Sequence, residues 1–340
     1  MKKRPRPDAD EGGSHGDALQ SWLCAAGGSL HPALRFGTDP FGGSGVFSTG
    51  PVAAPATLIF VPRQCILSLQ TTVENPIGRK LRDALLALDA ELAPEEATEI
   101  AAWLWMAMGR RVGRRAGGDQ EHPFHAYLAS LPSLTDDVAC WPETQRSAAG
   151  LEATPVADEI EQALGLAAYC ADLASRLPKR LQPTEGDCVG TAEVLWARGV
   201  FLSRGFPAGL LDAAGEHRDS DAEEERNSSL GGCVGCLLPG IDVANHRAGA
   251  AVSWIGSAAG VALRTDATLG AGVEVFNNCE SPPTAPPAPH LPSASHAPSS
   301  DVRWLTRRRR RQGQRVASFA LCARPPTDVA HRPAPPMHCL

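Results

Sequence analysis

Hydrophobic residues recur at steps of three and four over most of the region 74–195. The pattern is clearest in 81–92, 94–113 and 155–177, and the second of these segments opens with proline and acids and closes with arginines and glycine. Acidic residues near a helix N-terminus and basic residues near its C-terminus complement the helix dipole. The sequence therefore predicts amphipathic helices here, and a further helix over 191–207.

Short apolar runs bounded by turn residues flank this helical region on both sides. Before it, 58–61 (LIFV) closed by Pro62 predicts a strand, and after it two short runs between His246 and Gly272 are β-like. A short helix is expected over 17–28, which ends on glycines as helices commonly do. The predicted fold class is therefore α+β.

The two ends of the chain lack hydrophobic periodicity. Residues 1–17 are polar, charged and glycine-containing, and twelve prolines lie between Pro282 and Pro336. Such segments bury too little apolar surface to offset the entropy of ordering, so we expect 1–17 and 282–340 to be disordered. Residues 282–340 carry nine Lys/Arg against two Asp/Glu, which makes this tail basic and leaves the body acidic. The arginine block 307–311 could bind nucleic acid electrostatically, but it lacks interleaved aromatics and a fold to present it, so a nucleic-acid-associated protein acting through this tail is only the weakest alternative.

Composition narrows the class further. The chain has 340 residues, 43% of them hydrophobic, which is enough for a real core. Its ten cysteines follow no regular framework, and no apolar run resembles a signal peptide or a membrane span. We expect an intracellular protein with reduced thiols and no membrane partner, cytoplasmic or nuclear, with a plastid left open. Cys233 and Cys236 form a C-x-x-C without a second pair, so no metal site is expected.

Three short phrases carry the candidate chemistry. The first is the glycine-rich run 42–47 (GGSGVF), ahead of the predicted strand. The second is 203–206 (SRGF), at the end of the helix predicted over 191–207. The third is 239–246 (PGIDVANH), which is followed by 272–278 (GVEVFNN).

These phrases, in this chain order, resemble those of SET-domain protein lysine methyltransferases of the Rubisco large-subunit methyltransferase-like branch. The run 123–132 (PFHAYLASLP) also resembles a family phrase, inside the helical insert of that branch. The resemblance implies a β-rich SET core made of 18–73 and 196–281, split by a helical insert over 74–195. It also implies S-adenosyl-L-methionine as cofactor and a protein substrate that presents a lysine.

The resemblance further implies roles for single residues. Cofactor contacts are expected from the glycine-rich turn, from the arginine and from the Asn-His pair: Gly42, Gly43, Ser44, Gly45, Arg204, Asn245 and His246. Asp242 and Arg204 are expected on the substrate side. Simpler readings stay open: a plain hairpin loop for the turn, a surface arginine for Arg204 and a satisfied core histidine for His246. The aromatic residues Trp103, Trp105, Phe124 and Tyr127 are expected in the core.

The chain departs from the family pattern at Cys279, which stands where the family has a tyrosine. In the family this tyrosine lines the methyl-transfer channel and helps to orient the acceptor amine. A thiol cannot replace the aromatic wall and the hydroxyl, so we expect the chain as written to have little or no activity, and 280–340 to be a truncated or mis-spliced continuation. The alternatives are a catalytically inactive SET-like protein-binding module and a histidine N-methyltransferase.

Overall fold

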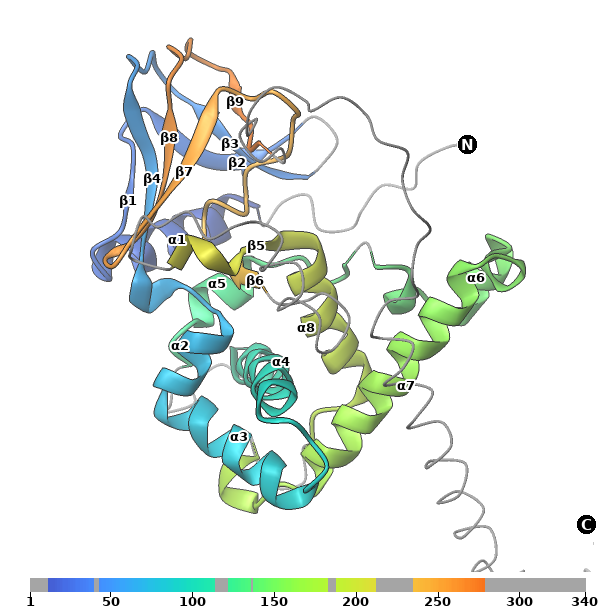
Figure 1. Cartoon of the computed structure of the whole chain (residues 1–340). Coiled ribbons are helices and arrows are strands. Elements are labelled where there is room, and N and C mark those ends of the chain that lie inside the picture. The colour runs from blue at the N-terminus through green and yellow to red at the C-terminus, as the bar shows by residue number, and fades with distance from the viewer. Residues whose placement is uncertain are drawn as a thin grey trace, which may run out of the picture. The chain divides into compact units, whose positions relative to one another are not determined.

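The structure, a computed structural model, describes residues 12–39, 43–113, 122–135, 137–182, 188–211 and 235–278. All of these residues belong to one compact unit, Met1–Ser293. Helices and strands are both abundant, and the strands gather apart from most of the helices (Figure 1). The α+β class is therefore confirmed.

The strands of the described residues form three antiparallel sheets, with the orders β1-β4-β8-β7, β2-β3-β9 and β5-β6. Their bounds are β1 (Ser29–Leu30), β2 (Leu34–Thr38), β3 (Ser44–Ser48), β4 (Ala56–Pro62), β5 (Gly205–Pro207), β6 (Gly235–Leu237), β7 (Val252–Ser257), β8 (Gly260–Thr265) and β9 (Glu274–Val275). Strand β4 pairs with β8, and β3 pairs with β9. The segments before and after the helical region thus share sheets, although about two hundred residues separate them.

Burial explains why the long sheet forms. In β4, Leu58, Ile59 and Val61 are all fully buried, and Ile59 and Val61 lie opposite Leu263 and Val261 of β8. Burying one such side chain contributes about 2 kcal/mol. The apolar run at 58–61 therefore forms the centre of this sheet, as its pattern predicts.

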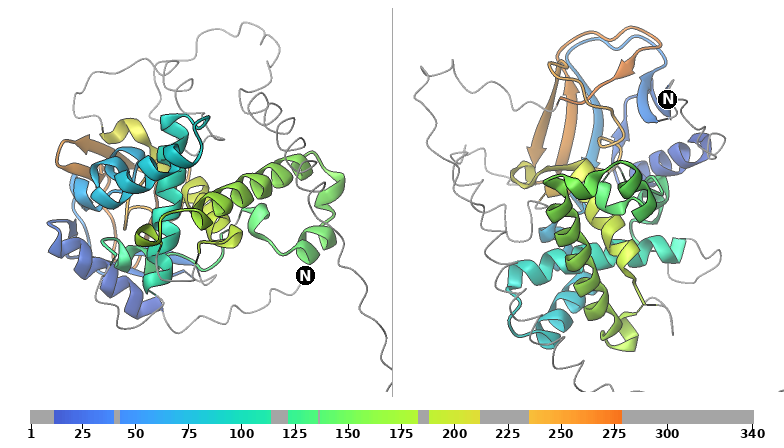
Figure 2. Two further views of the ribbon diagram at one scale, coloured as in Figure 1. Left: turned by 90° about the horizontal axis from the view of Figure 1, so that it is seen from below. Right: turned by 90° about the vertical axis from the view of Figure 1, so that its right-hand side faces the viewer.

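Most of the described helices surround one central helix. Their bounds are α1 (Gly12–Ala25), α2 (Leu69–Glu74), α3 (Pro76–Leu88), α4 (Pro94–Gly113), α5 (His125–Ser130), α6 (Glu143–Ala148), α7 (Val156–Ser175) and α8 (Thr191–Arg204). Helix α4 contacts α2, α3, α5, α7 and α8, and it appears end-on between them in Figure 1 and lengthwise in Figure 2. Its Trp103 and Trp105 are buried, as are Phe124 and Tyr127, which confirms the predicted core aromatics. None of the described helices is long and apolar enough to cross a membrane.

Helix ends agree with the sequence where the end signals are strong. Helix α4 has the predicted bounds, and α7 agrees with 155–177 to within two residues. The helix predicted over 81–92 instead runs from Pro76 to Leu88. The side chain of Asn75 accepts a hydrogen bond from the backbone of Ile77, and proline at the first helical position is favourable. These residues favour a helix that begins at Pro76, ahead of the apolar pattern over 81–92.

Two expected boundaries need correction. Helix α1 begins at Gly12, so residues 12–17, which we expect to be disordered, are helical in the structure. Gly16 lies against Phe36, where an added Cβ would stand 3.0 Å from the Phe36 Cβ, and this packing supports the extra turn. Helix α8 ends at Arg204 rather than at 207, because Gly205–Pro207 pairs with Gly235–Leu237 as β5.

Candidate functional site

The segment that carries Asp242 turns sharply back on itself. Gly240 has a φ of 90°, a left-handed conformation that favours glycine, and its N–H donates to Asp242 Oδ1 at 3.1 Å. Asp242 Oδ2 accepts a hydrogen bond from the Tyr127 hydroxyl at 2.7 Å. Burial raises the pKa of the Asp242 carboxyl, while Arg204 and the donated hydrogen bonds pull it down. Asp242 is thus a buried carboxyl group surrounded by donors from three elements.

Arg204, at the end of α8, lies against the same carboxyl group. Its Nη1 donates to the backbone oxygen of Asp242 at 2.8 Å and stands 3.7 Å from Asp242 Oδ2. The Arg204 side chain is 21% exposed, whereas that of Asp242 is 0% exposed. Arg204 is therefore anchored rather than a free surface arginine. Both contacts use Nη1, and a guanidinium has five N–H donors, which leaves donors for a ligand carboxylate.

Asn245 joins the glycine-rich turn to the last strand. Its Nδ2 donates to Glu274 Oε1 at 2.7 Å and to the backbone oxygen of Ser44 at 3.2 Å, and it lies 3.5 Å from Asp39 Oδ2. Asp39 in turn accepts a hydrogen bond from the Gly43 N–H at 2.8 Å. The amide side chain of Asn245 therefore connects the glycine-rich run 42–47 with the segments 239–246 and 272–278.

Residues 44–47 of the glycine-rich run belong to β3, which pairs antiparallel with β2, and contact of the run with a cofactor stays a prediction. The turn is also a place of close packing. A Cβ added at Gly45 would stand 3.0 Å from Phe47 and 3.2 Å from Glu274 Oε1. Glycine lets the backbone lie against Glu274 here. Gly42 lies outside the described residues.

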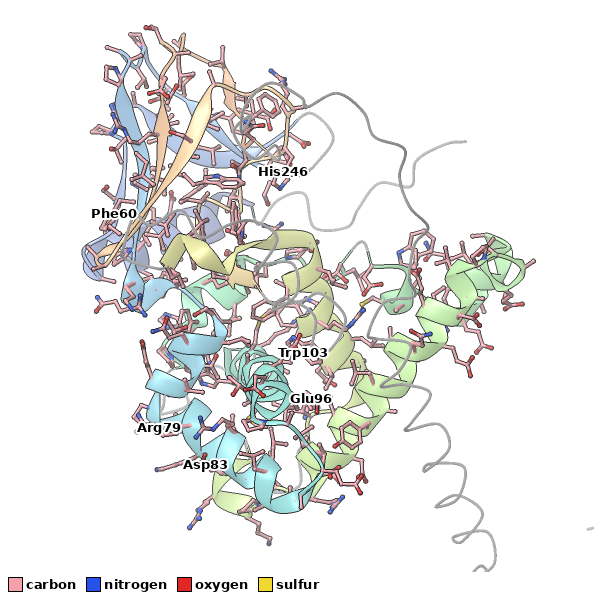
Figure 3. The ribbon with its side chains drawn as sticks, in the orientation of Figure 1. Phe60, Arg79, Asp83, Glu96, Trp103 and His246 are labelled. Atoms are coloured by element: carbon pink, nitrogen blue, oxygen red, sulfur yellow. The ribbon has the colours of Figure 1, made fainter. Side chains whose placement is uncertain are left out.

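His246 pairs through its backbone and exposes its ring. It forms a parallel bridge with Asn277, in which Asn277 N donates to Asn245 O at 2.7 Å and Arg247 N donates to Asn277 O at 2.9 Å. Because this bridge uses the flanking residues, the N–H and C=O of His246 itself point to the opposite edge of the segment. Partial burial lowers the pKa of the His246 ring, with a smaller effect from Arg204. The residue as a whole is exposed, so His246 is not a core histidine, and Figure 3 places it on the strand-rich side.

Asn277, the partner of His246, is itself held firmly. It is fully buried, and its Oδ1 accepts hydrogen bonds from Trp254 Nε1 at 2.7 Å and from Asn278 N at 3.0 Å. Beside it, the Arg247 guanidinium lies 3.4 Å from the centre of the Phe276 ring. These contacts fix the segment that ends the described part of the chain, one residue before Cys279, which lies outside it.

Asp242 is expected on the substrate side, and its surroundings in the structure are buried ones. Its side chain is 0% exposed and both carboxylate oxygens accept hydrogen bonds within the protein. The expected contact of Asp242 with a substrate stays a prediction. The site residues that do come together are Ser44, Gly45, Arg204, Asn245 and His246, with Gly43 joined through Asp39.

Sequence reasoning missed Tyr127, Asp39 and Glu274 as parts of the site. Tyr127 is correctly expected in the core, but a buried tyrosine hydroxyl needs a partner, and a buried carboxylate needs donors. That pairing rule could have suggested Tyr127 with Asp242. Nothing in the sequence signals Asp39, since its contact depends on the hairpin geometry.

Cys236 is buried, and burial raises the pKa of its thiol to about 12. The described residues contain no group of three potential metal ligands.

The described part of the chain has the fold of the SET domain in solved structures of LSMT. A solved structure of the SET domain of LSMT bound to lysine and AdoHcy is similar, with a TM-score of 0.55 and 17% identity, covering 78% of this chain and 54% of that chain. A structure of Rubisco LSMT bound to AdoMet gives 0.54 and 17%, covering 78% of this chain and 53% of that one. The chain thus spans about half the length of these structures. No protein-family model and no curated protein matches it.

Proposed function

We propose that this chain binds S-adenosyl-L-methionine at the Asn-His segment and belongs functionally with the SET-type protein-lysine N-methyltransferases. The observation that carries the proposal is the backbone of His246. In the bridge to Asn277 the flanking residues make the hydrogen bonds, so the His246 N–H and C=O face away from Asn277, and the same segment contacts Ser44 through Asn245 and Arg204 through the Asp242 backbone oxygen. An outward donor and acceptor pair suits an adenine edge, and a partly exposed guanidinium suits the amino-acid carboxylate of the cofactor.

The donor groups near this segment are the chemical basis for a cofactor with an adenine and a carboxylate. The glycines keep the turn close to the residues that hold it, since a Cβ added at Gly43 would stand 2.7 Å from Asp39 Oδ2. Partial burial lowers the pKa of the His246 ring, which favours its neutral form. When bound, the cofactor would supply a sulfonium-bound methyl group: a neutral amine would attack the methyl carbon in line, the carbon–sulfur bond would break and the sulfur would leave as a thioether.

The protein's own work in such a reaction is to align donor and acceptor and to exclude water. The acceptor lysine has a reference pKa of about 10.4, so it must lose a proton before it can act as a nucleophile. An apolar channel favours the neutral amine. The residue that the family places on this channel aligns with Cys279, outside the described residues. We therefore expect cofactor binding with little or no methyl transfer from this chain.

The proposal is tested by binding. Calorimetric titration of the whole chain with S-adenosyl-L-methionine should show a saturable heat, and the thermal midpoint should rise with cofactor concentration. His246→Pro removes the backbone N–H, whereas His246→Ala keeps it. We expect the proline variant to lose at least tenfold in affinity and the alanine variant to lose much less, with circular dichroism confirming that both are folded. Absence of heat and of a thermal shift at millimolar cofactor refutes the proposal.

The second candidate is a SET-like protein-binding module without catalysis, and the cysteine at position 279 favours it. Both candidates expect little or no transfer from the chain as written, so a labelled methyl-transfer assay on peptides that contain lysine or histidine is run on this chain and on a chain with a family-like tyrosine-glycine segment and C-terminal helical domain grafted after Asn278. Transfer that appears only in the grafted chain supports the methyltransferase, cofactor binding without transfer in both chains supports the binding module, and transfer by the unmodified chain at a rate similar to that of an intact relative refutes the binding module. Such transfer would also mean that Cys279 is not aligned with the family tyrosine.

A further inference from the structure

A buried hydrogen bond connects the helical insert to the Asn-His segment. Tyr127, on α5, and Asp242 are 115 residues apart in sequence, and the Tyr127 hydroxyl donates to Asp242 Oδ2 at 2.7 Å. Both side chains are fully removed from solvent. We propose that Tyr127 is a positioning residue, which holds Arg204 and the Asn-His segment in place for the cofactor; the inference rests on the proposed function.

The first step concerns the charge of Asp242. A carboxylate without solvent access is costly unless donors surround it. Three donors do so: the Tyr127 hydroxyl, the Gly240 N–H at 3.1 Å and the Arg204 guanidinium at 3.7 Å. Removing the hydroxyl takes away the shortest of these contacts and leaves the remaining two to hold a buried charge.

The second step concerns what Asp242 holds. Its backbone oxygen accepts from Arg204 Nη1 at 2.8 Å, and Asn245 follows three residues later. A shift of Asp242 therefore moves both Arg204 and the start of the Asn-His segment. No other described residue both belongs to the insert and hydrogen-bonds the Asp242 side chain. Tyr127 is thus the point where the insert can influence the site.

The chain offers a matched control. Its sequence has two tyrosines, and the second, Tyr169 on α7, also donates to an aspartate: its hydroxyl lies 2.7 Å from Asp89 Oδ2. That pair joins α7 to the residue after α3, and neither Tyr169 nor Asp89 is among the residues assigned to the cofactor site. Tyr127→Phe and Tyr169→Phe therefore remove the same atom from the same kind of bond at two places.

The experiment measures cofactor affinity and unfolding of the cofactor-free protein for both variants, for Asp242→Asn and for the double variant Tyr127→Phe/Asp242→Asn. We expect Tyr127→Phe to weaken S-adenosyl-L-methionine binding about tenfold, the effect of losing part of a hydrogen bond to a charged group. Tyr169→Phe should change affinity less than twofold. Asp242→Asn should also weaken binding, and Tyr127→Phe should add less than threefold on that background, because the two groups act through one bond.

The possible outcomes separate the two proposals. No binding by the unmodified chain refutes the cofactor site and this inference with it. Binding by the unmodified chain that Tyr127→Phe leaves unchanged refutes only this inference. Equal loss of affinity in both tyrosine variants also refutes it, because a general loosening of the helices would then be the cause. If Tyr127→Phe does not fold, Asp242→Asn decides: unchanged affinity in that variant refutes the inference, and a tenfold loss supports it.

Discussion

Replacing Asn245 with aspartate is the sharpest test of how the three phrases of the site are held together. In the structure Asn245 Nδ2 faces Glu274 Oε1 at 2.7 Å, Ser44 O at 3.2 Å and Asp39 Oδ2 at 3.5 Å. All three are acceptors. Asn245→Asp keeps the shape of the side chain but replaces the donor with an acceptor, which turns each attraction into a repulsion.

The size of the effect follows from these distances. Losing one hydrogen bond to a charged group and one to a neutral group costs about 3 kcal/mol in total, which is the expectation for Asn245→Ala. Two carboxylates about 3 Å apart repel by about 5 kcal/mol at an effective dielectric constant of about 20. Uptake of a proton limits that repulsion. Asn245→Asp should therefore cost more than Asn245→Ala at neutral pH, but only while the new carboxyl group is ionised.

The stability of Asn245→Asp should depend on pH, and the direction of that dependence follows from the neighbouring carboxylates. Glu274 and Asp39 raise the pKa of the introduced carboxyl in the folded state above its unfolded value. The folded state then binds more protons than the unfolded state, so the stability of Asn245→Asp falls as pH rises through the folded pKa. Below that pKa the protonated carboxyl can donate to Glu274 and restore part of the lost bond.

Urea unfolding at pH 5 and pH 8 measures this directly for the unmodified chain and both variants. We expect Asn245→Asp to be less stable than Asn245→Ala at pH 8, and at pH 5 the difference should shrink or reverse. Equal stability of the two variants at both pH values would mean that Asn245 does not face Glu274. It would then not connect the glycine-rich turn to the last strand.

Two further predictions concern stability. Burial lowers the pKa of His122 from its ordinary 6.5 to about 4, so between these pH values the unfolded state binds a proton that the folded state does not. The free energy of unfolding should therefore fall as pH drops from 6.5 toward 4. In urea unfolding, His122→Gln should lack this dependence of stability on pH. A Cβ at Gly256 would stand 1.9 Å from the backbone oxygen of Leu210, so Gly256→Ala should lower the free energy of unfolding by about 3 kcal/mol. Gly165, an exposed glycine within α7 with open space around it, is the control. Gly165→Ala should raise the free energy of unfolding by about 1 kcal/mol, and a lower free energy of unfolding in this variant would contradict the helical conformation of Gly165.

Local signals predict the elements whose formation is local. Helix α4 has a complete set: proline and acids at its start, arginines and glycine at its end, and apolar residues in between, so its bounds follow from the sequence. Helix α1 does not, because its first turn depends on packing against Phe36. Strands β1, β2 and β6 carry no alternation that would reveal them, since two to five residues are too few for a period to appear. Their place is set by partners far away in the chain.

The candidate site divides in the same way. The residues with family phrases, Arg204, Asn245 and His246, could be named from the sequence, and the structure brings them near one another. What the sequence could not predict is which groups touch. The burial of Asp242 depends on how the insert packs, and no local sequence signal shows that its side chain is 0% exposed. Chemistry can be inferred from residue types, but exposure is a property of the assembled fold.

The buried pair of Tyr127 and Asp242 suggests why an insert of this size belongs with the strand-rich part. Helices α3, α4 and α7 could bury their own apolar faces against one another without the sheets. The hydroxyl of Tyr127 has no such freedom, because a buried donor without an acceptor costs about 1–3 kcal/mol. Its acceptor is supplied by the Asn-His segment, whose carboxyl group in turn needs the hydroxyl. The insert therefore supplies a hydrogen-bond donor to the Asp242 carboxyl group, and the Asn-His segment supplies an acceptor to the Tyr127 hydroxyl. Because the Asp242 backbone oxygen also accepts from Arg204, the packing of the insert is coupled to the position of Arg204.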